Sequence, residues 1–597
     1  MKRLPVLVSF LMLLLTAANL RAQWSGNMEA SGGFGMIEGL RGQIMPTEGK
    51  YLHHWLAQGN ARLTYKIPTF TWESSLTGSY ESNDKDYFNA TLVGDRDNPI
   101  SLDGLISLSH EAPMSLQYRS DLTWTPSPGR KGKAWFQYRF THEDSEKANV
   151  EFSLQSHSGY YAEEPCYYNH VFETGINHSR DLGGTRRRLI GELVYGHTDW
   201  RQTTQYITVH MVDSETDRWA DMYRLTPHRY TDRISGVLHF ADSVATGPVK
   251  VLLDPGMRVN ASRAINENSG ATAELDENLD TNHPVWRDSV ELRERFNFLS
   301  LDIQPYLTAD LKADKISIHA NYALSVYARE LNDSTHTQGF RFKKPYVIGD
   351  GSVTWNMAKY HKLTFTNRLS VIHPTYLQVC WFDRSGGYID RLYRGNPDLK
   401  STYSSSFDLK YRFSYKRFEL EGSVKYGSIN DQIVQTWYRE EIDGRSYRVF
   451  TWVNGSYTKS VGTTEHLGWK GKVLTGGLDF SYNHSFLRFT EEDKVVKTSD
   501  WSLRANVGIN MGKGWNITAD AKYQSQVSSF FELFGQYCIV NAKIKKSFKN
   551  LTLYLEGRHL ADTPQDVRIE SDDGSQVWRE RTYGNRRLIV LGCSWKF

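Results

Sequence analysis

The end of the chain alternates between apolar and polar residues. Ile589, Leu591, Cys593, Trp595 and Phe597 share one face of this segment, and Phe597 is the last residue. A period of two with one continuous apolar face predicts a β-strand. Lipid accepts a sheet only when the sheet closes on itself and leaves no backbone edge unpaired. We therefore predict that this segment closes a membrane β-barrel and carries the signal read by the barrel-assembly machinery.

The same alternation recurs in pairs of runs that are joined by short polar turns, which is the pattern of a β-hairpin. The clearest pair flanks residues 511–514, and a second pair flanks residues 414–417. The other predicted turns lie near residues 66–69, 126–132, 181–185, 242–247, 312–315, 358–361, 470–472 and 547–550.

The strand number follows from these ten turns. They define 20 strands, the closing segment is strand 21, and a weaker alternation over residues 28–40 supplies one more. We predict an all-β protein, a transmembrane antiparallel barrel of about 22 strands, in agreement with the even strand number of bacterial barrels.

Longer polar stretches separate the hairpins, at residues 81–113, 197–231, 261–300 and 374–403. Outer-membrane barrels place short turns in the periplasm and long loops outside, so we expect both chain ends to be periplasmic. Too few residues precede the first hairpin for a separate plug domain. We therefore expect a plugless barrel whose lumen is occluded by a partner or by inward-folding loops, with residues 261–300 as the leading candidate.

The first 22 residues have the layout of a secretory signal. Lys2 and Arg3 precede an apolar run over residues 6–15, and small residues lead to Ala22. We expect cleavage there, a mature barrel over residues 23–597, and export to the outer membrane of a Gram-negative bacterium. The mean hydropathy of −0.54 is compatible with this reading, because only alternate residues of a barrel strand face lipid.

Two segments carry a resemblance to a known family. Residues 394–413, which begin Arg-Gly-Asn-Pro-Asp-Leu-Lys, resemble the passage from loop to strand in the barrels of TonB-dependent receptors. Residues 549–557 and 583–587 are similar to the terminal hairpin of that family in Bacteroidota. The family's plug, its TonB-contacting box and its fused regulatory domain are missing, and Ser401 stands where the family often has proline. The resemblance therefore implies a plugless outer-membrane barrel of Bacteroidota rather than energised import.

The candidate chemical sites are few. Arg394, Asn396, Asp398 and Lys400 could form a ligand cluster, but the intervening glycine and proline favour a turn that the polar residues cap. No nucleophile elbow or zinc-protease helix is present in the sequence. We predict no enzyme, no cofactor and no metal. Without the signal, 68 basic residues balance 68 acidic ones, which argues against nucleic-acid binding.

Two functions remain open from the sequence. The first is transport, with the barrel acting as a channel or as the pore of an import system and selecting solutes by its lumen lining. The second is a non-conducting scaffold that docks a surface lipoprotein, a TonB-dependent receptor or an assembly complex. The predicted lumen face includes Ser502, Arg504, Asn506, Asn510, Glu419, Glu421, Ser423 and Lys425. Their mixed signs argue against a strongly ion-selective filter.

Overall fold

The structure is a computed structural model of the chain, and it describes most residues from Trp24 onward. The described ranges are 24–38, 51–94, 99–153, 157–182, 187–212, 218–246, 249–274, 285–333, 337–379, 383–384, 391–442, 445–488, 495–528, 533–534, 536–561, 565–570, 576–584 and 587–596. The predicted signal peptide lies outside these ranges and stays a prediction.

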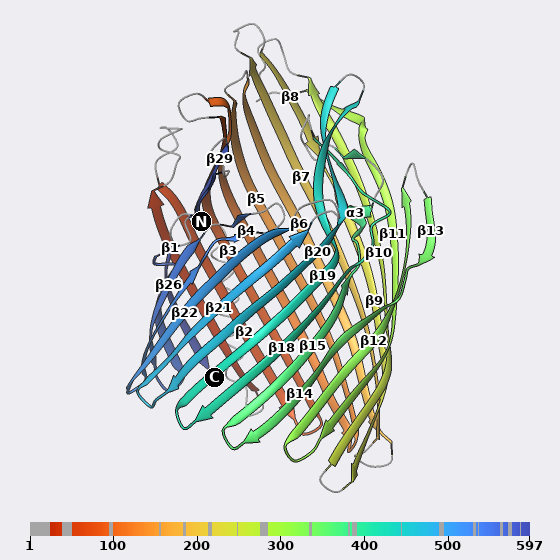
Figure 1. Cartoon of the computed structure of the whole chain (residues 1–597), viewed down its shortest axis with the longest axis vertical. Coiled ribbons are helices and arrows are strands. Elements are labelled where there is room, and N and C mark those ends of the chain that lie inside the picture. The colour runs from red at the N-terminus through yellow and green to blue at the C-terminus, as the bar shows by residue number, and fades with distance from the viewer. Residues whose placement is uncertain are drawn as a thin grey trace.

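A single antiparallel sheet of 22 strands closes into a barrel (Figure 1). In order around the ring the strands are β1 (Trp24–Glu38), β2 (Tyr51–Ile67), β3 (Phe70–Gly94), β4 (Pro99–Ser127), β5 (Arg130–Ser153), β6 (His157–Asp181), β7 (Arg187–Val212), β9 (His228–Thr246), β10 (Val249–Glu274), β11 (Val285–Lys312), β12 (Ile316–Asp333), β14 (Tyr346–Ala358), β15 (His361–Ile372), β18 (Thr402–Tyr415), β19 (Phe418–Ile442), β20 (Arg445–Lys470), β21 (Leu474–Arg488), β22 (Val496–Gly512), β23 (Trp515–Gln524), β26 (Tyr537–Ser547), β27 (Leu551–Arg558) and β30 (Leu588–Lys596).

The first and last strands close the ring. β1 pairs with β2 on one side and with β30 on the other, and Ala30 lies opposite Cys593. β30 also pairs with β27. No edge of the wall is left open at this seam, as a sheet in lipid requires. The predicted outward strand before the first hairpin is thus confirmed as β1.

All ten predicted short turns join consecutive wall strands in the structure. The turn predicted near residues 242–247 lies slightly later, because β9 runs to Thr246 and β10 begins at Val249. At the β22–β23 turn, Lys513 and Gly514 have φ values of 49° and 82°. Positive φ at both central residues matches the right-handed twist of the two strands.

Three of the four long polar stretches are not loops, which corrects the sequence prediction. β3 and β4 continue through most of residues 81–113, β7 and β9 enter residues 197–231, and β10 and β11 enter residues 261–300. Beyond the membrane both faces of a strand meet water, so alternation between apolar and polar residues is no longer required there. The prediction of an inward-folding loop at 261–300 is wrong, since these residues pair with each other in the wall up to Glu274 and Val285.

Shorter strands extend the wall at the long-loop end. β8 (Arg218–Leu225) pairs with β7 and β10, β13 (Thr337–Phe342) pairs with β12, and the hairpin of β28 (Gln565–Glu570) and β29 (Gln576–Gly584) pairs with β3. β24 (Val527–Ser528) and β25 (Leu533–Phe534) form a separate two-stranded sheet. The wall is taller on one side, where β4 has 29 residues, than at β15, which has 12 (Figure 1).

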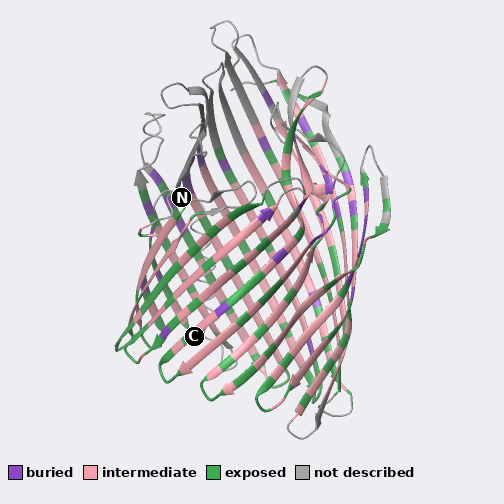
Figure 2. Ribbon diagram, viewed as in Figure 1, coloured by how far each residue is buried: buried purple, intermediate pink, exposed green. Residues whose placement is uncertain are grey.

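The two faces of the wall differ in polarity. Exposed and half-buried positions follow one another along the strands (Figure 2). Large apolar side chains remain exposed on the outer face, for example Ile234 at 52%, Leu238 at 56% and Val424 at 54%. Such an apolar band is stable in lipid and would aggregate in water. No helix among the described residues is long and apolar enough to cross a bilayer.

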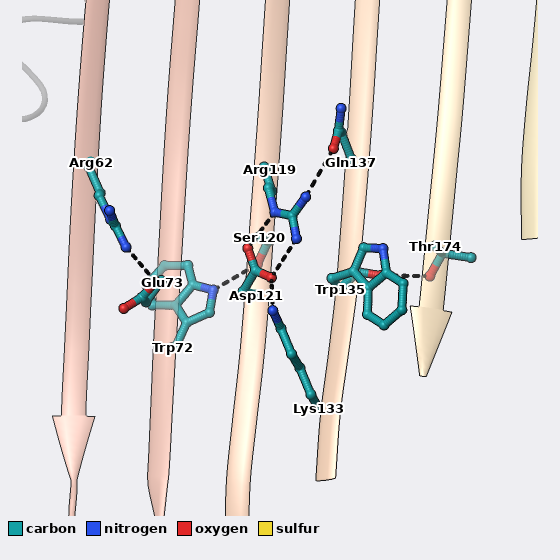
Figure 3. Close-up of polar contacts among 10 residues, drawn as sticks. All are labelled: Arg62, Trp72, Glu73, Arg119, Ser120, Asp121, Lys133, Trp135, Gln137 and Thr174. Atoms are coloured by element: carbon teal, nitrogen blue, oxygen red, sulfur yellow. Dashed lines mark hydrogen bonds and ion pairs between the residues drawn. The ribbon is translucent and has the colours of Figure 1, made fainter. Parts of the chain in front are cut away.

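Polar side chains on the inner face bond from strand to strand (Figure 3). Arg62 on β2 pairs with Glu73 on β3 at 2.6 Å. On β4 the Arg119 guanidinium donates to Asp121 at 2.7 Å, and Lys133 on β5 reaches the same carboxylate at 3.0 Å. These contacts pair oppositely charged side chains inside the barrel. They also hold polar groups in fixed positions along the lumen.

Candidate functional site

The lumen is the candidate site, and a long connection enters it at the outer end. We name residues 373–401, which join β15 to β18, the inner loop. It contains α3 (Tyr376–Val379), β16 (Asp383–Arg384) and β17 (Arg391–Arg394). β17 adds to β20 as a parallel strand, and α3 lies inside the outline of the barrel (Figure 1).

Apolar contacts hold the inner loop against the lumen face. Val379 is 0% exposed and Leu399 is 3% exposed. The Tyr376 ring lies 5.2 Å from the Phe296 ring of β11. The whole cluster comprises Ala264, Phe296, Phe298, Leu331, Val379 and Leu399, with Tyr376, Leu377, Ile433 and Trp452 packed against it. Burial of this kind stabilises the docked loop by roughly 25 cal/mol for each Å² of apolar surface removed from water.

One hydrogen bond and one ring stack hold the inner loop against β12. The Arg329 side chain is 1% exposed, and its Nη2 donates to the carbonyl oxygen of Pro397 at 2.6 Å. At the start of the loop the His373 ring stacks on Tyr327, with centroids 3.8 Å apart and planes 6° apart. The Nδ1 atom of His373 lies 2.8 Å from the hydroxyl of Ser401, which joins the two ends of the loop.

His373 lies just beyond the last residue of β15 and is largely buried. Burial lowers the pKa of its imidazole because the charged form loses hydration, and the nearby Arg329 guanidinium lowers it further, while Asp302 raises it. The docked loop therefore favours a neutral His373.

The Arg-Gly-Asn-Pro-Asp-Leu-Lys segment forms a turn that the Asn396 side chain caps, as predicted. The Asn396 side chain donates to the carbonyl oxygen of Trp452 at 3.0 Å and accepts from the backbone N–H of Asp398 at 3.0 Å. Arg394 forms an ion pair with Glu440 at 2.8 Å.

Lys400 contributes mainly through its backbone. Its N–H donates to Asn454 Oδ1 at 2.9 Å, and its carbonyl accepts from Asn454 Nδ2 at 3.1 Å. The ammonium is 71% exposed and lies 3.9 Å from Asp431, so this surface ion pair adds little stability.

A basic cavity lies between the inner loop and the short turns. Its volume is about 550 Å³, and β15, β18 and β19 form it. The charged residues that line it are Lys362, Arg368, Lys410, Arg412, Lys425, Asp408 and Glu421. Cations outnumber carboxylates in this lining, and the cavity is therefore electropositive.

Part of this charge is compensated locally. Lys410 pairs with Glu421 at 2.9 Å. Arg412 pairs with Glu419, which also binds Lys470 at 2.7 Å. Within the described residues no carboxylate lies within ion-pair distance of Lys362, Arg368 or Lys425, all of which share the lumen face. These three cations are available to an anion in the lumen.

The structure places the other residues selected from the sequence as follows. Ile589 and Leu591 of β30 are 63% and 68% exposed on the outer face, Cys593 is exposed beside them, and Trp595 is half-buried. Phe597 lies outside the described residues. The register pairs Glu421 with Arg412 and Arg504 with Asp479, which places both predicted lumen sets on one face of the sheet.

Apolar residues on the lumen face of the predicted strands are a sequence signal for the inner loop, and the alternation of residues alone does not reveal it. Phe296 and Phe298 on β11 and Leu331 on β12 occupy the lumen face, where polar residues prevail elsewhere. Apolar residues on a face that should meet water indicate that something covers them. The loop that covers them is 373–401.

Comparisons with known proteins agree with this architecture. Residues 353–595, from β14 to β30, match the outer membrane protein beta-barrel family. No curated protein sequence matches the chain. The fold is similar to that of the siderophore receptor PiuA from Acinetobacter baumannii, with a TM-score of 0.58 and 12% identity over 96% of this chain and 82% of that chain.

Two further structures show the same fold. The outer membrane transporter YddB from Escherichia coli has a TM-score of 0.58 and 11% identity, over 96% of this chain and 81% of that chain. The ferripyoverdine receptor of the outer membrane of Pseudomonas aeruginosa has a TM-score of 0.60 and 9% identity, over 97% of this chain and 72% of that chain. The closed sheet and its apolar outer face are those of a membrane β-barrel, and the family match over residues 353–595 indicates the outer membrane.

Proposed function

We propose that this barrel conducts small polar solutes across the outer membrane, and that the inner loop forms its constriction. The observation that carries the proposal is the docking of the described parts of the inner loop, residues 373–379 and 391–401, on the lumen face, where they narrow the passage. Selection by lumen lining and by a constricting loop is how such pores discriminate between solutes. The proposal takes the lumen to have no plug domain of its own.

The basic cavity supports a preference for anions. A solute that passes the inner loop would meet the free cations of Lys362, Arg368 and Lys425 before it reaches the short turns. Low-dielectric walls strengthen such a field, because they focus it into the cavity. This refines the expectation of a weakly selective pore, because cations outnumber carboxylates in the lining of the cavity.

Planar-bilayer recording tests this proposal. Purified protein should give discrete conductance steps, and the reversal potential under a salt gradient should show anion preference. Replacing all three free cations with glutamine should shift the reversal potential toward cation preference. Lys522→Gln is the matched control, because Lys522 is a lumen-face lysine on β23 that hydrogen-bonds Tyr537 at 3.1 Å. A silent protein, or equal shifts in both variants, would refute the proposal.

A second candidate is supported by the uneven wall. Strands β3 to β7, β10, β11, β19 and β20 extend far toward the outer end, whereas β14, β15 and β18 have only 12 to 14 residues and leave a low side between them (Figure 1). A surface lipoprotein or a TonB-dependent receptor could dock over that side and use the barrel as a pore or as a scaffold. Stoichiometric co-purification from native membranes, combined with the absence of conductance, would favour the scaffold.

We also propose that β30 is the segment read during assembly. Its outer face presents Ile589, Leu591 and Cys593 to lipid beside the seam with β1. Deleting Phe597 should reduce the inserted, heat-modifiable fraction in cells, whereas truncating the exposed Lys400 side chain to alanine should leave it unchanged. Equal insertion of both variants would exclude this role.

A further inference from the structure

Three side chains with metal-ligand chemistry converge on the outer surface of β5 and β6. They are His142, Asp144 and Cys166. Their donor atoms all lie within 4.8 Å of one another, and His142 Nε2 is 3.3 Å from Asp144 Oδ2. Asp144 and Cys166 are direct partners across the two strands. Among the described residues, these three form the cluster of His, Cys, Asp or Glu side chains whose donor atoms are close enough together to hold one ion.

The imidazole of His142 is held in the orientation that a metal ligand needs. Its ring stacks on Tyr168, with centroids 4.5 Å apart and planes 15° apart, and its side chain is only 14% exposed. Its Nδ1 lies 3.1 Å from the carbonyl oxygen of Tyr167. A carbonyl can only accept, so Nδ1 carries a hydrogen, and Nε2, which faces Asp144, is the atom left to bind an ion. Metal-binding histidines are commonly fixed by this kind of second hydrogen bond.

Without an ion, the thiol of Cys166 is hydrogen-bonded to the carboxylate of Asp144. A divalent cation would take the place of that proton between the sulfur and the carboxylate. The pair of His197 and Asp232 on the same outer face differs. There the Nδ1–carboxylate contact is 2.8 Å, Tyr195 donates to the same carboxylate, and this group has no thiol.

We propose that His142 Nε2, Asp144 Oδ and Cys166 Sγ form a three-ligand site for a divalent cation of borderline softness, with Zn²⁺ as the probe. Nitrogen, oxygen and thiolate donors together are typical of zinc sites, and a site with three protein ligands keeps a fourth position for water. Asp144 is 68% exposed, which leaves that position open to solvent. Binding releases the thiol proton of Cys166 as the thiolate coordinates the ion.

The place of the site suggests what the ion does. The outer-face rings of Phe140 and Tyr168 lie next to each other, with centroids 6.4 Å apart, and the three ligands are at or beyond that level on strands that continue outward. An ion there ties β5 to β6 where the wall leaves the membrane, and it stabilises the tall side of the barrel. The site is independent of the proposed channel.

The test uses the full-length protein, purified in detergent with its thiols reduced. Calorimetry should show one Zn²⁺ per chain, with binding that weakens as the pH falls because protons compete for the ligands. Cys166→Ser and His142→Ala should each weaken binding more than about 100-fold, since even second-shell changes cost 10- to 100-fold. Cys593→Ser, an exposed outer-face cysteine, and His197→Ala are the matched controls and should bind normally.

Cobalt substitution provides a second readout that does not depend on folding energies. Co²⁺ bound to the wild-type protein should show a thiolate charge-transfer band that Cys166→Ser lacks and Cys593→Ser keeps. The proposal is overturned if Zn²⁺ does not bind at one per chain, or if Cys166→Ser binds it as tightly as Cys593→Ser does. It is also overturned if the thiolate band is absent from the wild-type complex.

Discussion

The docking of the inner loop can be weakened at one residue. Asn396→Ala removes two hydrogen bonds, the one donated to the carbonyl oxygen of Trp452 and the one accepted from the N–H of Asp398, each 3.0 Å long. A hydrogen bond of this type contributes about 0.5–1.5 kcal/mol. Only the bond to Trp452 joins the loop to the wall, since Asp398 belongs to the loop itself. Its loss should destabilise the docked loop by about 1 kcal/mol, which changes the ratio of docked to undocked loop about 5-fold.

Single-channel recording measures this change directly. In Asn396→Ala the fraction of time spent in a higher-conductance state should rise about 5-fold as long as the loop remains mostly docked. Lys400→Ala is the matched control, because it keeps both backbone bonds to Asn454 and removes only an exposed ion pair of 3.9 Å. The reasoning is refuted if the two variants open equally often, or if Asn396→Ala leaves the conductance levels of the wild type unchanged.

Two further predictions concern pH and stability. The pKa of His373 is lowered in the docked loop, so protonation favours the undocked loop. Docking should therefore be constant above about pH 6.5, the ordinary histidine pKa. It should weaken as the pH falls below that value. Channel opening should therefore increase on acidification, and His373→Gln should remove most of that increase; an unchanged pH profile in this variant would exclude the mechanism. In the β22–β23 turn, Gly514 has a φ of 82° and a Cβ there would meet the carbonyl oxygen of Ser547. Gly514→Ala should lower the free energy of unfolding by about 1–3 kcal/mol, measured as urea sensitivity in detergent. Gly422→Ala, where an added Cβ would meet open space, should have a much smaller effect. Equal losses in the two variants would contradict this account of the turn.

The barrel was predictable where the membrane imposes a pattern. Alternating runs and short turns marked every wall hairpin, because lipid on one face and polar lumen on the other leave a period of two. The weak alternation of residues 28–40 was enough to place β1 next to the closing strand. Strand ends outside the membrane were not predictable, since β10 and β11 continue through polar residues that meet water on both faces.

The sites depended on pairings that a single sequence does not specify. Asp144 lies opposite Cys166 because of the register between β5 and β6. That register depends on the length of the connection after β5, which the sequence does not give while the strand ends are unknown. The prediction placed the occluding loop at 261–300 instead of 373–401. It rested on polar composition alone and did not consider that Phe296 and Phe298 are apolar residues on the lumen face. The segment that begins at Arg394 was correctly interpreted as a turn, since its glycine and proline constrain the backbone.

Disulfide cross-linking at the seam tests the closed barrel most directly. Ala30 on β1 faces Cys593 on β30, and paired residues of neighbouring antiparallel strands lie within the range that a disulfide can bridge. In a chain whose other three cysteines, Cys166, Cys380 and Cys538, are replaced by serine, Ala30→Cys should form this disulfide in the inserted protein. Ser31→Cys, which lies opposite Gly592 on the lumen side, should not. Absence of the Ala30–Cys593 cross-link, or equal cross-linking from both positions, would contradict a sheet that closes between its first and last strands.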